Sequence, residues 1–147
     1  VIPDCGITTD VIAGFCGETE QDHQDTLTLM EQVVFDSAFM FASSERPGTL
    51  ASKKYPDDIP YEEKTRRLNE IIALQGRMSL KSNEKEIGKR LKVLVEGPSK
   101  KNPDELCGRA SSNKMCVFPS RGEKPGDYCE VEVVSVTSAT LLCKRID

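Results

Sequence analysis

The sequence contains no tryptophan, only one histidine and no apolar run that approaches the ~20 residues of a membrane-spanning helix. A single histidine excludes the usual Cys/His zinc sites, and no two of the six cysteines are spaced C-x-x-C. No secretory signal pattern opens the chain. We therefore expect a cytoplasmic protein with no membrane partner, whose six thiols are reduced and buried as small hydrophobic residues.

Charge is distributed unevenly along the chain. Residues 1–88 carry a net charge of −7, residues 89–121 carry +5, and the remaining residues carry −2. Hydrophobic residues make up 37% and charged residues 30%, which is typical of a folded protein rather than a disordered one. A basic block within an acidic chain predicts a localised anionic partner.

The first part of the chain predicts a strand, a helix and a second strand. β-Branched residues run through residues 7–15 up to a glycine, as in a buried strand. Thr19 with acidic residues behind it is typical of a helix start. Residues 37–41 form the second predicted strand. This order predicts that the two strands are parallel neighbours.

The next segment predicts a loop and then a long helix. Residues 44–49 cannot continue a strand because they contain a Pro-Gly pair. A mostly apolar stripe at helical spacing predicts a helix over residues 61–86, with Gly88 as its stop. Gly76 lowers the stability of this helix, which leaves room for a packing reason at that position.

Beyond Gly88 the sequence changes to short alternating strands separated by turns. The predicted strands are residues 91–96, 115–118, 128–136 and 139–144. Strands of this number and length predict a small closed or nearly closed β-barrel, which leaves no open sheet edge. The predicted fold class is therefore α/β for residues 1–88 and all-β, as a small antiparallel β-barrel, for residues 89–147.

Three stretches of the sequence carry a family resemblance. They are residues 9–19 (TDVIAGFCGET), residues 44–49 (SERPGT) and residues 95–101 (VEGPSKK), the last followed by Gly108-Arg109 and Asn113-Lys114. In this order and spacing they resemble the MiaB-type tRNA methylthiotransferases, and the third stretch is similar to the opening of that family's TRAM domain.

The resemblance implies that residues 1–88 are the C-terminal part of a radical-SAM (β/α) barrel, with its last two strands and helices. It also implies S-adenosylmethionine and two 4Fe-4S clusters as cofactors of the complete enzyme. The cluster cysteines of the family have no counterpart in this chain, and the chain opens at Val1 without an initiator Met. We therefore expect that an N-terminal portion of the same enzyme is missing and that this fragment alone is inactive.

The resemblance assigns the first strand to the adenosine of S-adenosylmethionine. Ligands of such barrels lie at the C-terminal ends of strands, where Ile12, Gly14 and Phe15 are predicted. An apolar side chain and a missing Cβ would let an adenine ring approach the backbone, although a packed strand ending in a turn explains the same residues. Arg46 follows the second strand and could clamp a carboxylate or phosphate, or pair with Glu45 or with an acidic residue of a helix instead.

The basic block fits an RNA partner, which the resemblance identifies as the tRNA anticodon stem-loop, rather than DNA. Cations in loops neutralise phosphates, and Arg or Asn can read unpaired bases. The RNA-binding candidates are Lys100, Lys101, Arg109, Asn113 and Lys114. A solvated basic face stays open for Lys89, Lys92 and Arg121, and both Phe118 and Tyr128 are expected in the core rather than stacked on bases.

Three positions depart from the family pattern. Many relatives carry an aromatic residue where Ser43 stands, proline where Cys16 stands and glycine where Cys143 stands.

The function that the resemblance implies is the addition of a methylthio group to an isopentenylated adenosine beside the anticodon. Two alternatives stay open, namely a methylthiotransferase that acts on an aspartate of a ribosomal protein and a non-catalytic RNA-binding module.

Overall fold

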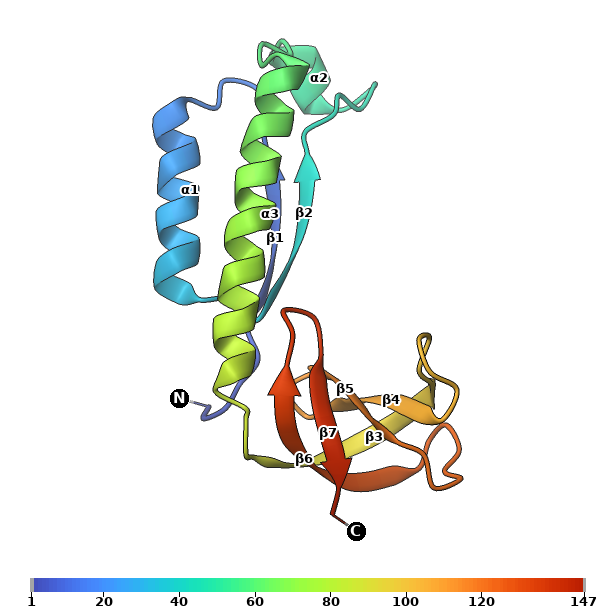
Figure 1. Cartoon of the computed structure of the whole chain (residues 1–147). Helices are drawn as coiled ribbons and strands as arrows, with labels where there is room; N and C mark the ends of the chain where they lie inside the picture. The colour runs from blue at the N-terminus through green and yellow to red at the C-terminus, as the bar shows by residue number, and fades with distance from the viewer. Residues whose placement is uncertain (1, 147) are drawn as a thin grey trace. The chain divides into compact units, whose positions relative to one another are not determined.

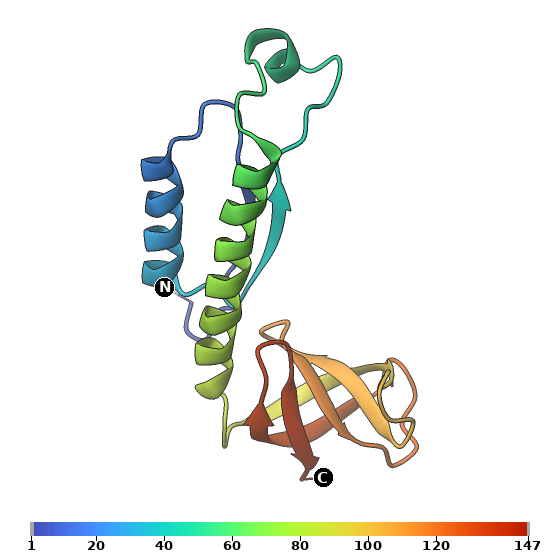
Figure 2. The ribbon, with the colours of Figure 1, turned by 45° about the horizontal axis from the view of Figure 1, so that its top comes forward.

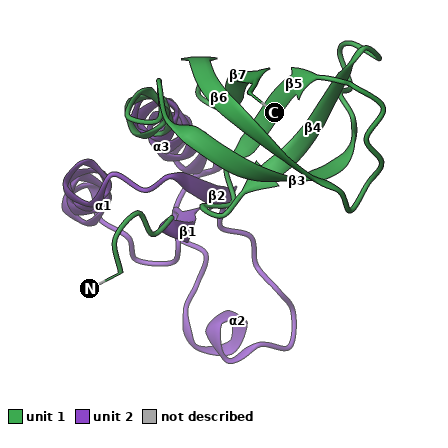
Figure 3. Cartoon of the chain, turned by 90° about the horizontal axis from the view of Figure 1, so that it is seen from below, with its two compact units in different colours: residues 1–6, 79–147 green, residues 7–78 purple. Residues whose placement is uncertain are grey.

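The computed structural model describes residues 2–146, which divide into two compact units (Figure 3). One unit is Ile7–Met78, called the helical unit below. The other consists of Val1–Gly6 with Ser79–Asp147 and is called the barrel unit. No helix in the described part of the chain is long and apolar enough to cross a membrane.

The helical unit opens with a strand, a helix and a strand. These are β1 (Thr8–Ala13), α1 (Glu20–Val33) and β2 (Ser37–Ala42). β1 and β2 pair in parallel from Thr8 opposite Ser37 to Ala13 opposite Ala42, which confirms the predicted pairing. α1 begins where the sequence predicts, because the Thr19 side chain accepts from the Asp22 backbone N–H and Asp22 accepts from that of Thr19 in return.

A short helix and the larger part of a long helix, which continues past Met78, complete this unit. A short helix, α2 (Leu50–Lys54), lies in the segment predicted as a loop, and the long helix α3 (Tyr61–Glu84) ends slightly before its predicted stop. α1 and α3 lie on the same face of the strand pair (Figure 1). Ala13, Met30, Ile71 and Leu74 form the apolar core between the strands and these helices.

The opposite face of the strand pair is not covered in the described part of this unit. Alternate residues of a strand point to opposite faces, so Ile12, Phe39 and Phe41 share the face turned away from the helices. Their exposed fractions are 57%, 68% and 54%. Apolar exposure of this extent on one sheet face is typical of an interaction or ligand surface rather than of a solvated one.

The barrel unit contains five strands that close on themselves in the order β3-β4-β5-β7-β6 (Figure 2). The strands are β3 (Arg90–Pro98), β4 (Glu105–Ala110), β5 (Met115–Pro119), β6 (Tyr128–Val136) and β7 (Leu141–Arg145). A closed small barrel is therefore confirmed, but the expectation of a wholly antiparallel barrel is wrong, because β5 and β7 pair in parallel. β4 was not predicted, because its sequence ELCGRA contains a glycine and no β-branched residue.

Inward-pointing side chains of all five strands fill the barrel. Phe118 is the largest of them, at 1% exposure, and Val93, Val131 and Leu141 are fully buried around it. Gly108 is needed because β4 approaches β3 closely, and an ideal Cβ at this position would lie 2.3 Å from the carbonyl oxygen of Leu94.

The expectation that all six cysteines are buried is wrong for three of them. Cys116, Cys129 and Cys143 are buried in the barrel core. Cys5 is exposed, whereas Cys16 and Cys107 are half-buried. All six are free thiols in the structure. A hydrogen bond that the Cys143 thiol donates to Cys116, together with burial, raises the pKa of the Cys143 thiol, so Cys143 is protonated at neutral pH.

We predict opposite effects of adding a methyl group at two glycines. Gly108→Ala should lower the free energy of unfolding by about 1–3 kcal/mol, because the new methyl would press on the backbone of β3. Gly76→Ala in α3 should raise it by about 0.5–1 kcal/mol, because open space surrounds that position and glycine disfavours a helix. Urea unfolding of both variants tests this, and a destabilised Gly76→Ala protein would contradict the absence of a packing reason.

Candidate functional site

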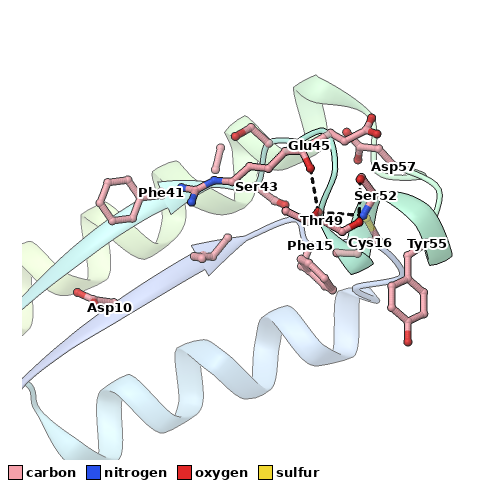
Figure 4. Close-up of a pocket in the computed structure, with 15 residues that line it drawn as sticks. Asp10, Phe15, Cys16, Phe41, Ser43, Glu45, Thr49, Ser52, Tyr55 and Asp57 are labelled. Carbon is pink, nitrogen blue, oxygen red and sulfur yellow. Dashed lines mark hydrogen bonds between the residues drawn. The ribbon is translucent and has the colours of Figure 1, made fainter.

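A cavity of about 490 Å³ opens in the helical unit at the carboxyl ends of β1 and β2 (Figure 4). Its apolar lining includes Ile12, Phe15 and Phe41, and its polar lining includes Asp10 and Arg46. These side chains come from both strands and from the loop that follows β2. A cavity with an apolar wall and a charged rim fits a ligand that has a flat apolar part and an ionised group.

Three of the four residues predicted to hold a cofactor line this cavity, namely Ile12, Phe15 and Arg46. Ile12 and Phe15 are 57% and 47% exposed, so both present apolar surface to a ligand. The Arg46 side chain is exposed and, among residues 2–146, forms no ion pair, so the alternative of a pair with Glu45 is not observed. The contact of these residues with a cofactor stays a prediction.

Gly14, the fourth predicted residue, is buried and does not line the cavity. It adopts φ +74°, and an ideal Cβ would lie 2.4 Å from Cγ of Lys64. The missing side chain makes room for Lys64, which gives this glycine a structural reason that the sequence did not predict. A direct contact between Gly14 and a ligand stays a prediction.

Lys64 is a buried cation that connects α3 to the edge of the cavity. Its side chain is 6% exposed, and Nζ donates to both carboxylate oxygens of Asp57, at 2.6 and 2.8 Å. Nζ also donates to the backbone oxygen of Ser43, at 3.2 Å. Because Asp57 lines the cavity and Ser43 follows β2, one ammonium group fixes both sides of the loop between β2 and α3.

Arg67, three residues further along α3, holds the end of the other strand, β1. Its side chain is also 6% exposed, and Nη1 donates to Oε1 and to the backbone oxygen of Glu18, at 2.8 and 2.9 Å. Oε1 of Glu18 also accepts from the backbone N–H of Gly14, at 3.0 Å. The turn after β1 is thus held by a carboxylate that is itself held by a buried guanidinium.

The loop that carries Arg46 is held by hydrogen bonds between the Thr49 hydroxyl and the loop backbone. The Thr49 hydroxyl donates to the carbonyl oxygen of Arg46, at 2.8 Å, and accepts from the backbone N–H of Ser52, at 3.2 Å. Thr49 is therefore the N-cap of α2 as well as the closure of the turn. Gly48 adopts φ +85° in this turn. The SERPGT stretch thus has a structural reason for both its glycine and its threonine.

A network of ion pairs extends from Arg67 along the exposed side of α3. Hydrogen bonds from Arg66, and then from Arg67, lower the pKa of Glu63 to about 2. A hydrogen bond from His23 and then one from Arg66 lower the pKa of Glu70. His23 is 1% exposed, and its Nε2 lies 2.7 Å from Oε2 of Glu70. These carboxylates are ionised wherever the fold is intact near neutral pH.

Sequence reasoning missed Lys64 and Arg67. The sequence does contain a signal for these two residues, because positive charge near the start of a helix is unfavourable with the helix dipole. Cations placed there need another reason, and in this structure the reason is their contacts with Asp57 and Glu18.

The predicted RNA-binding residues lie in the barrel unit, in and around the β3–β4 and β4–β5 connections. Lys100 and Lys101 are exposed in the first connection, and neither forms an ion pair within the described residues. Arg109 lies on β4 rather than in a loop. Its Nε donates to Oε1 of Glu96, at 3.1 Å, and its Nη1 donates to the carbonyl oxygen of Asn113, at 2.9 Å.

Lys114 has a structural contact that the sequence did not predict. Its side chain is 9% exposed, and Nζ donates to the hydroxyl and backbone oxygens of Ser82, at 2.9 and 3.2 Å. Oε1 of Glu86 lies 3.5 Å away. The ammonium group therefore bonds to residues of the barrel unit, and its contact with RNA stays a prediction.

Within residues 2–146, His, Cys, Asp and Glu side chains form no group of three or more that could hold a metal ion.

Replacement of Lys64 by methionine should lower the free energy of unfolding by about 1–3 kcal/mol. The change leaves the Asp57 carboxylate and the Ser43 carbonyl without their shared donor. Lys53→Met is the matched control, because Lys53 is an exposed lysine on α2. Equal stability of the two variants in urea would show that Lys64 does not stabilise the loop.

The ion-pair network predicts a loss of stability in acid. Because the folded-state pKa of Glu63 is about 2 and its ordinary value is 4.5, its contribution is present above about pH 4.5 and is lost as the pH falls toward 2. The free energy of unfolding, followed by the helical circular dichroism signal, should decrease over this range. Glu63→Gln should make the decrease shallower, and an unchanged slope would be inconsistent with the pairing.

Comparison with known proteins extends over nearly the whole chain. Residues 84–144 match the TRAM domain family. The chain is 52% identical over 141 residues to a protein of Phocaeicola vulgatus named tRNA-2-methylthio-N(6)-dimethylallyladenosine synthase, covering 96% of this chain and 31% of that protein. It is 55% identical over 139 residues to a protein of the same name from Amoebophilus asiaticus, covering 95% of this chain and 29% of that protein.

Among solved structures, the apo form of Mycoplasma genitalium RNase R gives a TM-score of 0.37 at 10% identity, over 65% of this chain and 19% of that one, a likeness too slight to inform the function. The chain spans about a third of the length of the curated relatives it matches. The resemblance to the tRNA methylthiotransferases is thus confirmed: the chain is similar to them over almost all of its residues, and residues 84–144 match the TRAM domain family.

Proposed function

We propose that this chain is the C-terminal third of an enzyme that adds a methylthio group to an isopentenylated adenosine beside the tRNA anticodon. The observation that carries the proposal is the similarity of 96% of the chain, at 52% identity, to a protein named for that product. In the complete enzyme, the fragment lines the pocket for cofactor and substrate and binds tRNA. The N-terminal portion of the same enzyme is its necessary partner, and the cytoplasm is its expected location.

The helical unit supports the proposal of a partial (β/α) barrel. Its two parallel strands have helices on one face only, and the other face exposes Ile12, Phe39 and Phe41. In a (β/α) barrel the inner face of each strand points to the interior, and ligands lie at the carboxyl ends of the strands. The cavity lies at that end of β1 and β2.

The cavity residues fit part of S-adenosylmethionine. Ile12, Phe15 and Phe41 offer apolar surface for an adenine ring, and Arg46 offers a guanidinium for a carboxylate. When bound to a 4Fe-4S cluster, this cofactor would supply the radical chemistry of the family. The cluster ligands belong to the missing portion under this proposal, so this fragment should show no activity alone. Lys64 and Arg67 then act as positioning residues that fix the strand ends on which the cavity is built.

The barrel unit supports RNA binding through exposed cations. Lys100 and Lys101 are exposed on one connection, where phosphates can reach them, and Arg109 and Asn113 lie close to each other at the next turn. Asn113 adopts φ +65°, and its exposed amide could pair with an unpaired base.

Binding of an anticodon stem-loop RNA to the whole chain tests this proposal. The affinity should fall steeply as salt is raised, because protein cations displace counterions from phosphates. The double variant Lys100→Ala with Lys101→Ala should bind more weakly. Its slope of log affinity against log salt should be smaller by about 1.4, the value for two contacts with single-stranded RNA.

The double variant Lys53→Ala with Lys54→Ala is the matched control, since it removes two exposed lysines from α2. It should keep the wild-type affinity and slope. Absence of RNA binding by the wild-type chain, or equal loss in both double variants, would contradict the proposed role of the barrel unit.

A further inference from the structure

The outer surface of the barrel carries a row of side chains from four neighbouring strands. Tyr128 on β6 is paired with Leu94 on β3, Leu94 is paired with Arg109 on β4, and Arg109 is paired with Met115 on β5. Residues paired across antiparallel strands point to the same face of the sheet. We call Tyr128, Leu94, Arg109 and Met115 the outer row.

Most of the outer row is accessible. The exposed fractions are 61% for Tyr128, 36% for Leu94 and 41% for the side chain of Arg109, while Met115 is half-buried. Among the described residues of the barrel unit, Tyr128 is the exposed aromatic residue and Phe118 is the buried one. The expectation that Tyr128 lies in the core is therefore wrong.

Two sets of contacts place charged groups at the outer row. Nζ of Lys92 lies over one face of the Tyr128 ring, 4.7 Å from its centroid, in a cation–π contact. The Arg109 guanidinium is held at one edge by Glu96 and at another by the Asn113 carbonyl. A guanidinium held in this way is a planar group that can stack on another planar group.

We infer that the outer row is a stacking surface for an unpaired RNA base. This inference rests on the proposed function and adds the part of the RNA that is recognised. The outer row combines a phenol ring, a leucine, a guanidinium plane and a thioether. Together they offer a flat, largely apolar surface, which stacks on bases regardless of their identity. Lys92 lies where it can neutralise the phosphate next to a base stacked on Tyr128. The row therefore recognises a base face, whereas Lys100 and Lys101 recognise only the backbone.

The test uses the whole chain and an anticodon stem-loop RNA with 2-aminopurine in its loop, whose fluorescence is quenched by stacking. Tyr128→Ala should weaken binding about 5- to 150-fold, the range for loss of one stacked base, with an unchanged salt slope. Tyr128→Phe keeps the ring and should bind within about twofold of wild type. Tyr61→Ala removes a similarly exposed tyrosine from α3 and should have no effect.

A second variant keeps the inference testable if Tyr128→Ala fails to fold, as judged by circular dichroism. Arg109→Lys keeps the charge but removes the plane, so it should weaken binding without changing the salt slope. If the wild-type chain binds RNA and both Tyr128→Ala and Arg109→Lys bind equally well, the stacking surface is wrong and the proposed function stands. If the wild-type chain binds no RNA, both are overturned.

Discussion

A single buried ammonium group connects the parts of the helical unit from which the cavity is built. Nζ of Lys64 bonds to Asp57 and to the carbonyl of Ser43, while the aliphatic part of the same side chain lies over Gly14. A lysine is buried in this way only when its charge is paired and its donors are used. The end of β1, the end of β2 and the loop before α3 therefore share one support. Arg67 repeats the arrangement through Glu18 and the backbone of Gly14.

The two units are stabilised differently, and this difference suits what each is proposed to bind. The helical unit has a small apolar core and relies on buried charge pairs near its cavity, so its strand ends are held in fixed positions while one sheet face stays apolar and open. The barrel unit has a continuous apolar core from all five strands. Its outward-facing positions are thereby free to carry cations and flat side chains without loss of the fold.

Regular patterns in the sequence predicted most of the fold, and contacts between distant residues account for what they did not predict. The parallel pair of β1 and β2 and the Thr19 cap follow from local patterns. β4 was missed because its glycine is required by the approach of Leu94 on another strand. Likewise, the cavity position of Ile12, Phe15 and Arg46 was predicted, but the reason for Gly14 depends on Lys64, fifty residues further along the chain. Lys114 was assigned to RNA by its place in a motif, and its contact with Ser82 is visible only in three dimensions.

The proposed function places bound RNA on the outer face of the barrel unit. Ultraviolet crosslinking of the whole chain to an anticodon stem-loop RNA, with the adducts located by mass spectrometry, would identify the residues that the RNA touches. We expect adducts at Tyr128 and within residues 92–114. Adducts confined to the helical unit, with the barrel peptides unmodified, would show that RNA does not bind to this face.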